Sequence, residues 1–190
     1  NDAIYRHNTS YAEAVLLFPR KAVHMGNIDA VAKFRETGRA LLESHVLFDI
    51  LPDDIATPER LAAYQKIYRP GDKTVKGATE FTAPKTIRVS ANRPAKGDTL
   101  HLHFVNYNRT EPTKPKSAGG GIHDEKPISV RGIQCSVPLP LGSKLKAAHF
   151  FSPEKGSAVE LQVEFRENKA HFTLPEFLVY GVVELKWSRQ

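Results

Sequence analysis

The feature that most constrains the fold of this chain is a change in its hydrophobic periodicity near residue 84. Beyond that point helical spacing disappears, and β-rich segments alternate with turns rich in proline, glycine and asparagine. Seven such segments are typical of an antiparallel sandwich. They span residues 86–91, 99–106, 128–137, 144–152, 158–165, 169–174 and 177–187. We therefore expect a β-sandwich with no helix longer than two turns between residues 84 and 187.

Alternation of apolar and polar residues predicts the core of this sandwich. The pattern is clearest in residues 158–165, where every second side chain is apolar and should face inward. These inward-facing residues are Val159, Leu161, Val163 and Phe165. Phe104, Phe172 and Val179 are further predicted core residues. Cys135 lies in an alternating stretch and is the only cysteine, so its predicted role is packing rather than disulfide formation.

Three short apolar runs before residue 70 are predicted to be strands of a parallel sheet. The first, residues 14–18, is continuously apolar and ends at Pro19, as expected for a strand that is buried on both faces. The second, residues 45–51, ends at Pro52, and the third is the short run 66–68. Strands of this kind need crossover connections, which are usually helices.

Helix signals occupy both gaps between these strands. Asn27 or Asp29 can cap the first helix, and Thr57 followed by Pro58 begins the second. The stripe of the first helix that should pack on the sheet consists of Ile28, Val31 and Phe34. The predicted fold class is therefore α+β, a small βαβαβ unit followed by an antiparallel β-sandwich. The expected boundaries are 1–69 for the α/β unit, 70–83 for a linker and 84–190 for the sandwich.

The α/β unit stops after only three predicted strands. Its third strand should leave an apolar edge or face uncovered unless something packs there. We expect self-association or a large interface between the two halves, with Phe48, Ile67 and Tyr68 as hypothetical contact residues.

Composition and charge exclude some classes of function. The net charge of +6 comes from scattered basic residues without interleaved aromatics, so nucleic-acid binding is not favoured. The longest apolar runs are far shorter than the roughly 20 residues of a membrane span, and no membrane association is expected.

Three segments of the β-rich half resemble the C-terminal sandwich of multidomain, β-galactosidase-like glycoside hydrolases. They are residues 100–109 (LHLHFVNYNR), 137–142 (VPLPLG) and 172–180 (FTLPEFLVY). In that family such segments close a small β domain behind the catalytic barrel. Residues 13–19 and 41–49 similarly resemble the amidotransferase-like, trimerisation-like domain between barrel and sandwich, which here is truncated and lacks the Gly-x-Cys-x-Gly nucleophile turn.

This resemblance implies a non-catalytic accessory region of a carbohydrate-active protein. The barrel itself has no counterpart, because 190 residues cannot hold a barrel of about 250 residues beside these elements. The implied partners are a catalytic domain or another subunit, a further copy of the chain, and carbohydrate. No cofactor is implied. The residues do not encode a location, whereas the resemblance is compatible with a secreted or periplasmic one.

Carboxylates in the segment 110–127 are the candidates for catalysis. Glycoside hydrolysis uses two carboxylates about 5–9 Å apart, and Glu111 and Glu125 are the available pair. Neighbouring lysines favour the alternative that these acids are solvated or ion-paired. A stand-alone glycoside hydrolase is therefore one of three hypotheses.

A polar cluster beside this segment contains amides and an aromatic ring of the kind that bind sugar hydroxyls. Its candidate ligand-binding residues are Asn106, Tyr107, Asn108, Arg109 and Asp124. A carbohydrate-binding module would need a row of exposed aromatics, for which Tyr107, Tyr180 and Trp187 are available. The alternative is a polar loop folded over the sandwich edge.

Histidines supply the weak candidates for a metal site. His101 and His103 are two residues apart on a predicted strand, which places both rings on one face. His123 could provide a third ligand. The alternative, which we favour, is a hydrogen-bonded histidine pair without a metal.

Overall fold

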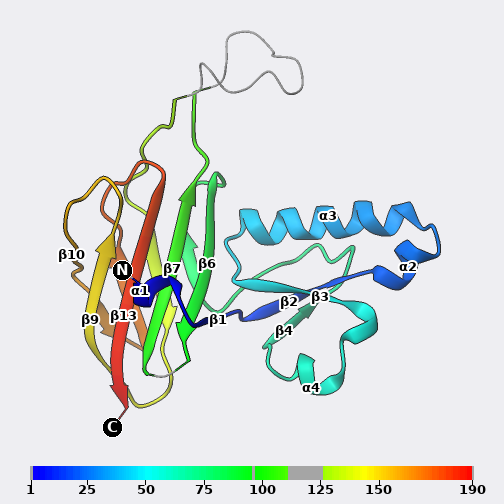
Figure 1. Cartoon of the computed structure of the whole chain (residues 1–190), viewed down its shortest axis with the longest axis horizontal. Coiled ribbons are helices and arrows are strands. Elements are labelled where there is room, and N and C mark those ends of the chain that lie inside the picture. The colour runs from blue at the N-terminus through cyan, green and yellow to red at the C-terminus, as the bar shows by residue number, and fades with distance from the viewer. Residues whose placement is uncertain (1, 96, 111–125, 190) are drawn as a thin grey trace.

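The computed structural model describes residues 2–95, 97–110 and 126–189 and has the expected α+β architecture (Figure 1). A small parallel sheet with helices on both sides lies beside a sandwich of two antiparallel sheets. None of the helices in these ranges combines the length and hydropathy that a membrane-spanning helix needs.

The parallel sheet contains the three predicted strands. Strand β2 (Ala14–Phe18) is central, between β3 (Phe48–Pro52) and β4 (Lys66–Tyr68). A central strand is covered on both faces, which explains its apolar sequence: Val15 and Leu16 are both 0% exposed. Strand β3 pairs only with β2 along its whole length. Its second edge is open within the described ranges.

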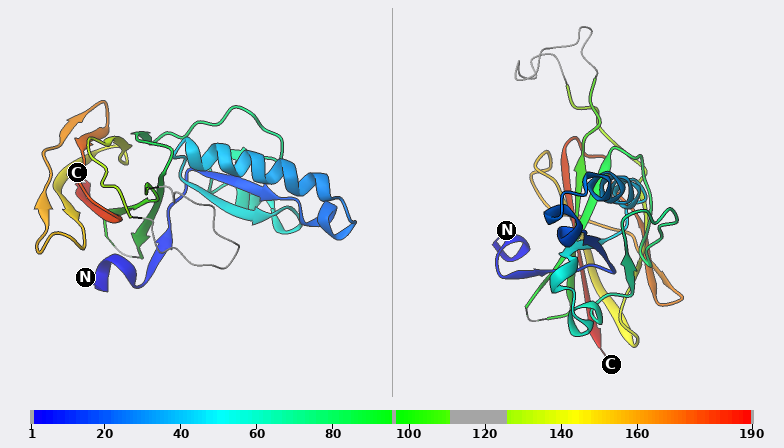
Figure 2. Two further views of the ribbon diagram at one scale, coloured as in Figure 1. Left: turned by 90° about the horizontal axis from the view of Figure 1, so that it is seen from above. Right: turned by 90° about the vertical axis from the view of Figure 1, so that its right-hand side faces the viewer.

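Helices connect these strands as crossovers. After α2 (Arg20–His24), α3 (Ile28–Glu43) begins at Asn27, whose side chain accepts a hydrogen bond from the N–H of Ala30 at 3.2 Å. The predicted packing stripe is wrong at its first position, because Ile28 is 80% exposed. Phe34 packs on the sheet as predicted, together with Leu41. The second crossover holds a 3₁₀ turn, η1 (Asp53–Ile55), and α4 (Pro58–Leu61), on the side of the sheet opposite α3 (Figures 1 and 2).

The sandwich comprises one six-stranded and one four-stranded sheet. The larger sheet has the order β1-β6-β7-β13-β9-β10, with β1 at Asn8–Ser10, β6 at Ile87–Pro94, β7 at Thr99–Asn106, β13 at Tyr180–Arg189, β9 at Ser143–Phe151 and β10 at Val159–Glu160. The smaller sheet has the order β11-β12-β8-β5, with β11 at Glu164–Arg166, β12 at Lys169–Thr173, β8 at Gln134–Pro138 and β5 at Glu80–Thr82. No helix lies between residues 84 and 187 in the described ranges.

The predicted core is correct in part. Phe104 and Phe172 are buried at 0% and 5% exposure, and Val163 packs against the core from a half-buried position. Val179 is 43% exposed, because β13 begins only at Tyr180. Phe165 is 39% exposed, because the expected single strand 158–165 divides into β10 on one sheet and β11 on the other. Cys135 is buried in the core as predicted.

Strand pairing and packing join the α/β unit to the sandwich. Strand β1 pairs with β6, and β5, from the expected linker, pairs with β8. Leu47, which precedes β3, is 1% exposed and belongs to the sandwich core. The boundaries at residues 69 and 84 stay predictions, while the sandwich sheets recruit strands from before residue 84. The short helix α1 (Asp2–Tyr5) precedes β1 and buries Ile4.

Candidate functional site

Four of the predicted site residues, Glu111, His123, Asp124 and Glu125, lie outside the described residues. The catalytic pair and the third metal ligand therefore stay predictions. Within the described ranges, no group of three or more His, Cys, Asp or Glu side chains could hold a metal ion.

The predicted sugar-binding cluster divides into buried and exposed members. Asn106 is 4% exposed, and its Nδ2 donates to the carbonyls of Ile128 at 2.8 Å and Leu178 at 2.7 Å. Its Oδ1 accepts from the N–H of Asn108 at 2.9 Å. The Asn106 side chain is thus fully used in holding neighbouring chain segments. Tyr107 is 52% exposed and is the only predicted member with a free aromatic face.

The three aromatics considered for a carbohydrate platform do not form an exposed row. Trp187 is only 6% exposed and belongs to the sandwich core. The Tyr180 hydroxyl accepts a hydrogen bond from Nδ1 of His103 at 2.6 Å. Of the three, Tyr107 alone presents its ring to solvent.

His101 and His103 lie on one face of β7, as expected, and are joined by the side chain of Asn92 from β6. The Asn92 Oδ1 accepts from Nδ1 of His101 at 3.0 Å, and its Nδ2 donates to Nε2 of His103 at 2.7 Å. These roles assign the proton of neutral His103 to Nδ1, which donates to Tyr180. The two rings thus form a hydrogen-bonded pair.

Burial sets the electrostatics of this pair. It lowers the pKa of His103, and the charge of His101 lowers it further. Nε2 of His101 lies 3.3 Å from Oε2 of Glu184 on β13. Burial alone would raise the pKa of Glu184, but hydrogen bonds from Lys186 and His101 outweigh burial and lower it. Each of the four ring nitrogens of the two histidines thus has a partner within this network.

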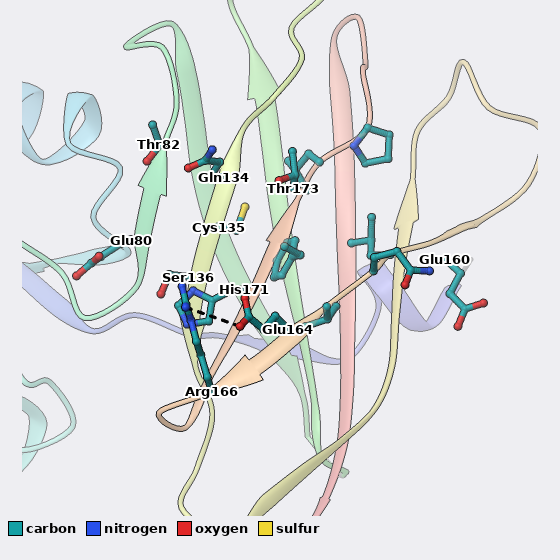
Figure 3. Close-up of a pocket in the computed structure, with 16 residues that line it drawn as sticks. Glu80, Thr82, Gln134, Cys135, Ser136, Glu160, Glu164, Arg166, His171 and Thr173 are labelled. Atoms are coloured by element: carbon teal, nitrogen blue, oxygen red, sulfur yellow. Dashed lines mark ion pairs between the residues drawn. The ribbon is translucent and has the colours of Figure 1, made fainter.

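A cavity of about 940 Å³ lies over the four-stranded sheet (Figure 3). Its floor includes one row of directly paired residues, one from each strand: Glu80, Ser136, His171 and Glu164. Arg166 lies 3.7 Å from the Glu164 carboxylate, and Lys169 lies 3.8 Å from that of Glu80. Each of the two carboxylates of the row therefore has a cation nearby, in an exposed and weak ion pair. The alternation predicted for residues 158–165 places Glu164 on the solvent face, but the sequence predicts neither β5, which carries Glu80, nor the register that assembles this row.

A second groove, of about 460 Å³, lies between α3 and the open edge strand β3. It is lined by Leu16, Phe34, Arg35, Gly38, Arg39, Leu42, Phe48, Ile50 and Arg88. Ile50 is 56% exposed and Leu42 is 37% exposed. Of the expected contact residues, Phe48 lines this groove. Tyr68 is buried within the α/β unit, where its hydroxyl donates to the Lys76 carbonyl at 3.0 Å.

No protein-family model and no curated protein matches this chain. Among solved structures it is similar to alpha-L-fucosidase isoenzyme 2 from Paenibacillus thiaminolyticus, with 16% identity and a TM-score of 0.43, over 58% of this chain and 15% of that one. It is also similar to a cycloisomaltooligosaccharide glucanotransferase from Paenibacillus sp., with 14% identity and a TM-score of 0.41, over 77% of this chain and 27% of that one. The chain spans less than a third of the length of either enzyme.

Proposed function

We propose that this chain is a non-catalytic accessory region of a carbohydrate-active protein of the glycoside hydrolase type. It packs against a catalytic domain or another subunit. The observation that carries the proposal is the open edge of the parallel sheet: β3 pairs on one side only and exposes Ile50 beside an apolar groove. Exposed apolar surface at an unpaired edge is costly to keep in water and is typical of an interaction site.

The sequence supplies the enzyme class in this proposal. The segments 100–109, 137–142 and 172–180 resemble the closing sandwich of β-galactosidase-like enzymes. A carbohydrate-binding module has less support, because Trp187 is buried in the sandwich core and the hydroxyl of the half-buried Tyr180 is bonded to His103. A stand-alone hydrolase depends on Glu111 and Glu125, which the structure does not describe.

Two assays on the purified chain separate these three functions. Turnover of a panel of aryl glycosides tests hydrolysis, and retardation in gels that contain polysaccharide tests carbohydrate binding. We expect neither. Turnover lost in both Glu111→Gln and Glu125→Gln would favour a hydrolase, because each change removes a carboxylate at nearly constant size. Retardation without turnover, reduced by Tyr107→Ala, would favour a binding module.

A further inference from the structure

The groove between α3 and β3 has an apolar floor and a basic rim. Leu16, Phe34 and Phe48 contribute the floor, and Arg35, Arg39 and Arg88 contribute guanidinium groups. None of its lining residues is acidic. Arg35 and Arg39 come from α3, while Arg88 comes from β6 of the sandwich. Both halves of the molecule therefore build this groove.

The positive charge of the rim is only partly balanced within the described part of the chain. None of the three arginines forms an ion pair there. The Nη1 of Arg88 donates to the backbone carbonyls of Lys85 and Ile87, which carry no net charge. Glu43, at the end of α3, forms its ion pair with Lys85 at 2.9 Å. Its carboxylate also interacts with the charges of Arg39 and Arg88 without pairing with either. The groove thus presents unpaired cations around an apolar strip.

The strand beside this groove can accept a further strand. In β3 the side chains alternate, so Phe48 and Ile50 face the groove while Asp49 lies on the other face. The Asp49 carboxylate accepts from the Ser10 hydroxyl at 2.7 Å and the Tyr64 hydroxyl at 3.0 Å. It is therefore held away from the open edge. An edge with free backbone groups and apolar side chains binds extended peptides by strand addition.

We propose that the groove between α3 and β3 binds an extended, acidic segment of a partner polypeptide as an additional strand on β3. Backbone hydrogen bonds to β3 would supply the pairing, alternate apolar side chains would fill the strip beside Ile50, and carboxylates would meet the three arginines. Charge argues against a second copy of this chain as the occupant, because two such grooves would bring their arginine rims together. This inference rests on the proposed packing function and names the partner chemistry of the same surface.

Binding of a designed probe tests the proposal. The probe is a short fluorescent peptide of alternating valine and glutamate, and its comparison is the same peptide with lysine in place of glutamate. We expect the acidic peptide to bind and to increase amide-exchange protection at residues 48–52. The double variant Arg35→Glu/Arg39→Glu should weaken binding by about tenfold or more, because it reverses the charge of the rim. Ile50→Lys should also weaken binding by about tenfold, because it removes exposed apolar contact.

Two matched variants control for general effects of charge and hydropathy. Lys33→Glu reverses an exposed charge on α3 outside the groove, and Leu141→Lys changes a leucine that is 88% exposed in a sandwich turn. Both should bind the acidic peptide like the unchanged chain. The substitutions of all four variants are at the surface, so folding can be verified by their unchanged melting temperatures.

Several results would overturn the assignment. They are no binding of the acidic peptide, equal binding of the lysine peptide, or binding without protection of residues 48–52. Displacement of the peptide by polygalacturonate with the same arginine dependence would assign the groove to an acidic glycan. Self-association abolished by Ile50→Lys would assign it to a second copy. A failed peptide test removes only this inference, because turnover and gel retardation test the proposed function separately.

Discussion

The carboxylate of Glu13 binds the backbone N–H of Thr79, 66 positions later in the chain, with both oxygens at 3.0 Å. It also accepts from the Thr79 hydroxyl and, at 2.7 Å, from the N–H of Ala78. Glu13 is only 3% exposed. A single buried carboxylate at the start of β2 therefore anchors the segment that leads from the α/β unit into the sandwich.

We predict that Glu13→Gln destabilises the fold. An amide presents one acceptor oxygen where the carboxylate uses two, and its NH₂ group would face N–H donors. Loss of hydrogen bonds to a charged group should reduce the free energy of unfolding by about 1.5–3 kcal/mol. Urea denaturation measures the change, and Glu36→Gln, on the exposed side of α3, is the matched control. Equal stability of the two variants would contradict the anchoring role.

Gly181 is predicted to be irreplaceable even by alanine. A Cβ atom there would lie 2.6 Å from Cε2 and 2.8 Å from Cζ of Phe150, which is fully buried. The ring cannot move without disturbing the core, so Gly181→Ala should cost about 1–3 kcal/mol of unfolding free energy. Gly156→Ala, where a Cβ meets nothing within 4 Å, should be nearly neutral. Thermal denaturation of both variants tests this, and Phe150→Leu should recover part of the loss at position 181.

Local sequence patterns were sufficient to predict most strands and the fold class. The strand 99–106 coincides with β7, and the apolar run 14–18 coincides with β2. In both cases the core-facing positions of the strand are apolar, so the sequence pattern predicts the strand. The pattern failed at residues 158–165, because regular alternation cannot reveal that a strand leaves one sheet and joins the other.

The candidate surfaces were less predictable. Both grooves are built from residues far apart in the chain, such as Arg39 on α3 and Arg88 on β6. Their meeting depends on how the two halves pack, which no local pattern records. Asn106 illustrates the opposite error: its amide suggested ligand binding, yet burial and three hydrogen bonds give it a structural role.

Stability is predicted to fall as the pH drops from about 7.5 to 5.5. Burial lowers the pKa of His103 and of His45 below the ordinary 6.5, so the unfolded chain binds protons before the folded one does. The free energy of unfolding therefore decreases as the pH falls through 6.5 towards the lower pKa values of the folded state. Urea midpoints over this range measure the slope.

Substitution of one histidine should change that slope. His103→Gln should reduce the slope of stability against pH, because the variant lacks the buried imidazole whose pKa is lowered in the folded state. His24→Gln, at an exposed position, should leave the slope unchanged. A slope that is the same in His103→Gln and in the unchanged chain would mean that other groups control the pH dependence.

The packing of Leu47 couples the α/β unit to the sandwich. Leu47 precedes β3 but is 1% exposed within the sandwich core, and the N–H groups of Glu13 and Ala14 donate to its carbonyl at 2.9 and 3.2 Å. Its side chain therefore belongs to one half and its backbone to the other. Leu47→Ala should lower the unfolding free energy by about 2–5 kcal/mol, because it removes buried methyl groups and leaves a cavity.

Two probes report the halves separately. Circular dichroism follows α3, the longest helix, and fluorescence follows Trp187, the only tryptophan, in the sandwich core. In the unchanged chain the two transitions should coincide, since Leu47 makes the halves unfold together. Leu47→Ala should shift both transitions, whereas Leu141→Ala, at a side chain that is 88% exposed, should shift neither. Transitions that are already separate in the unchanged chain would show that the halves fold independently.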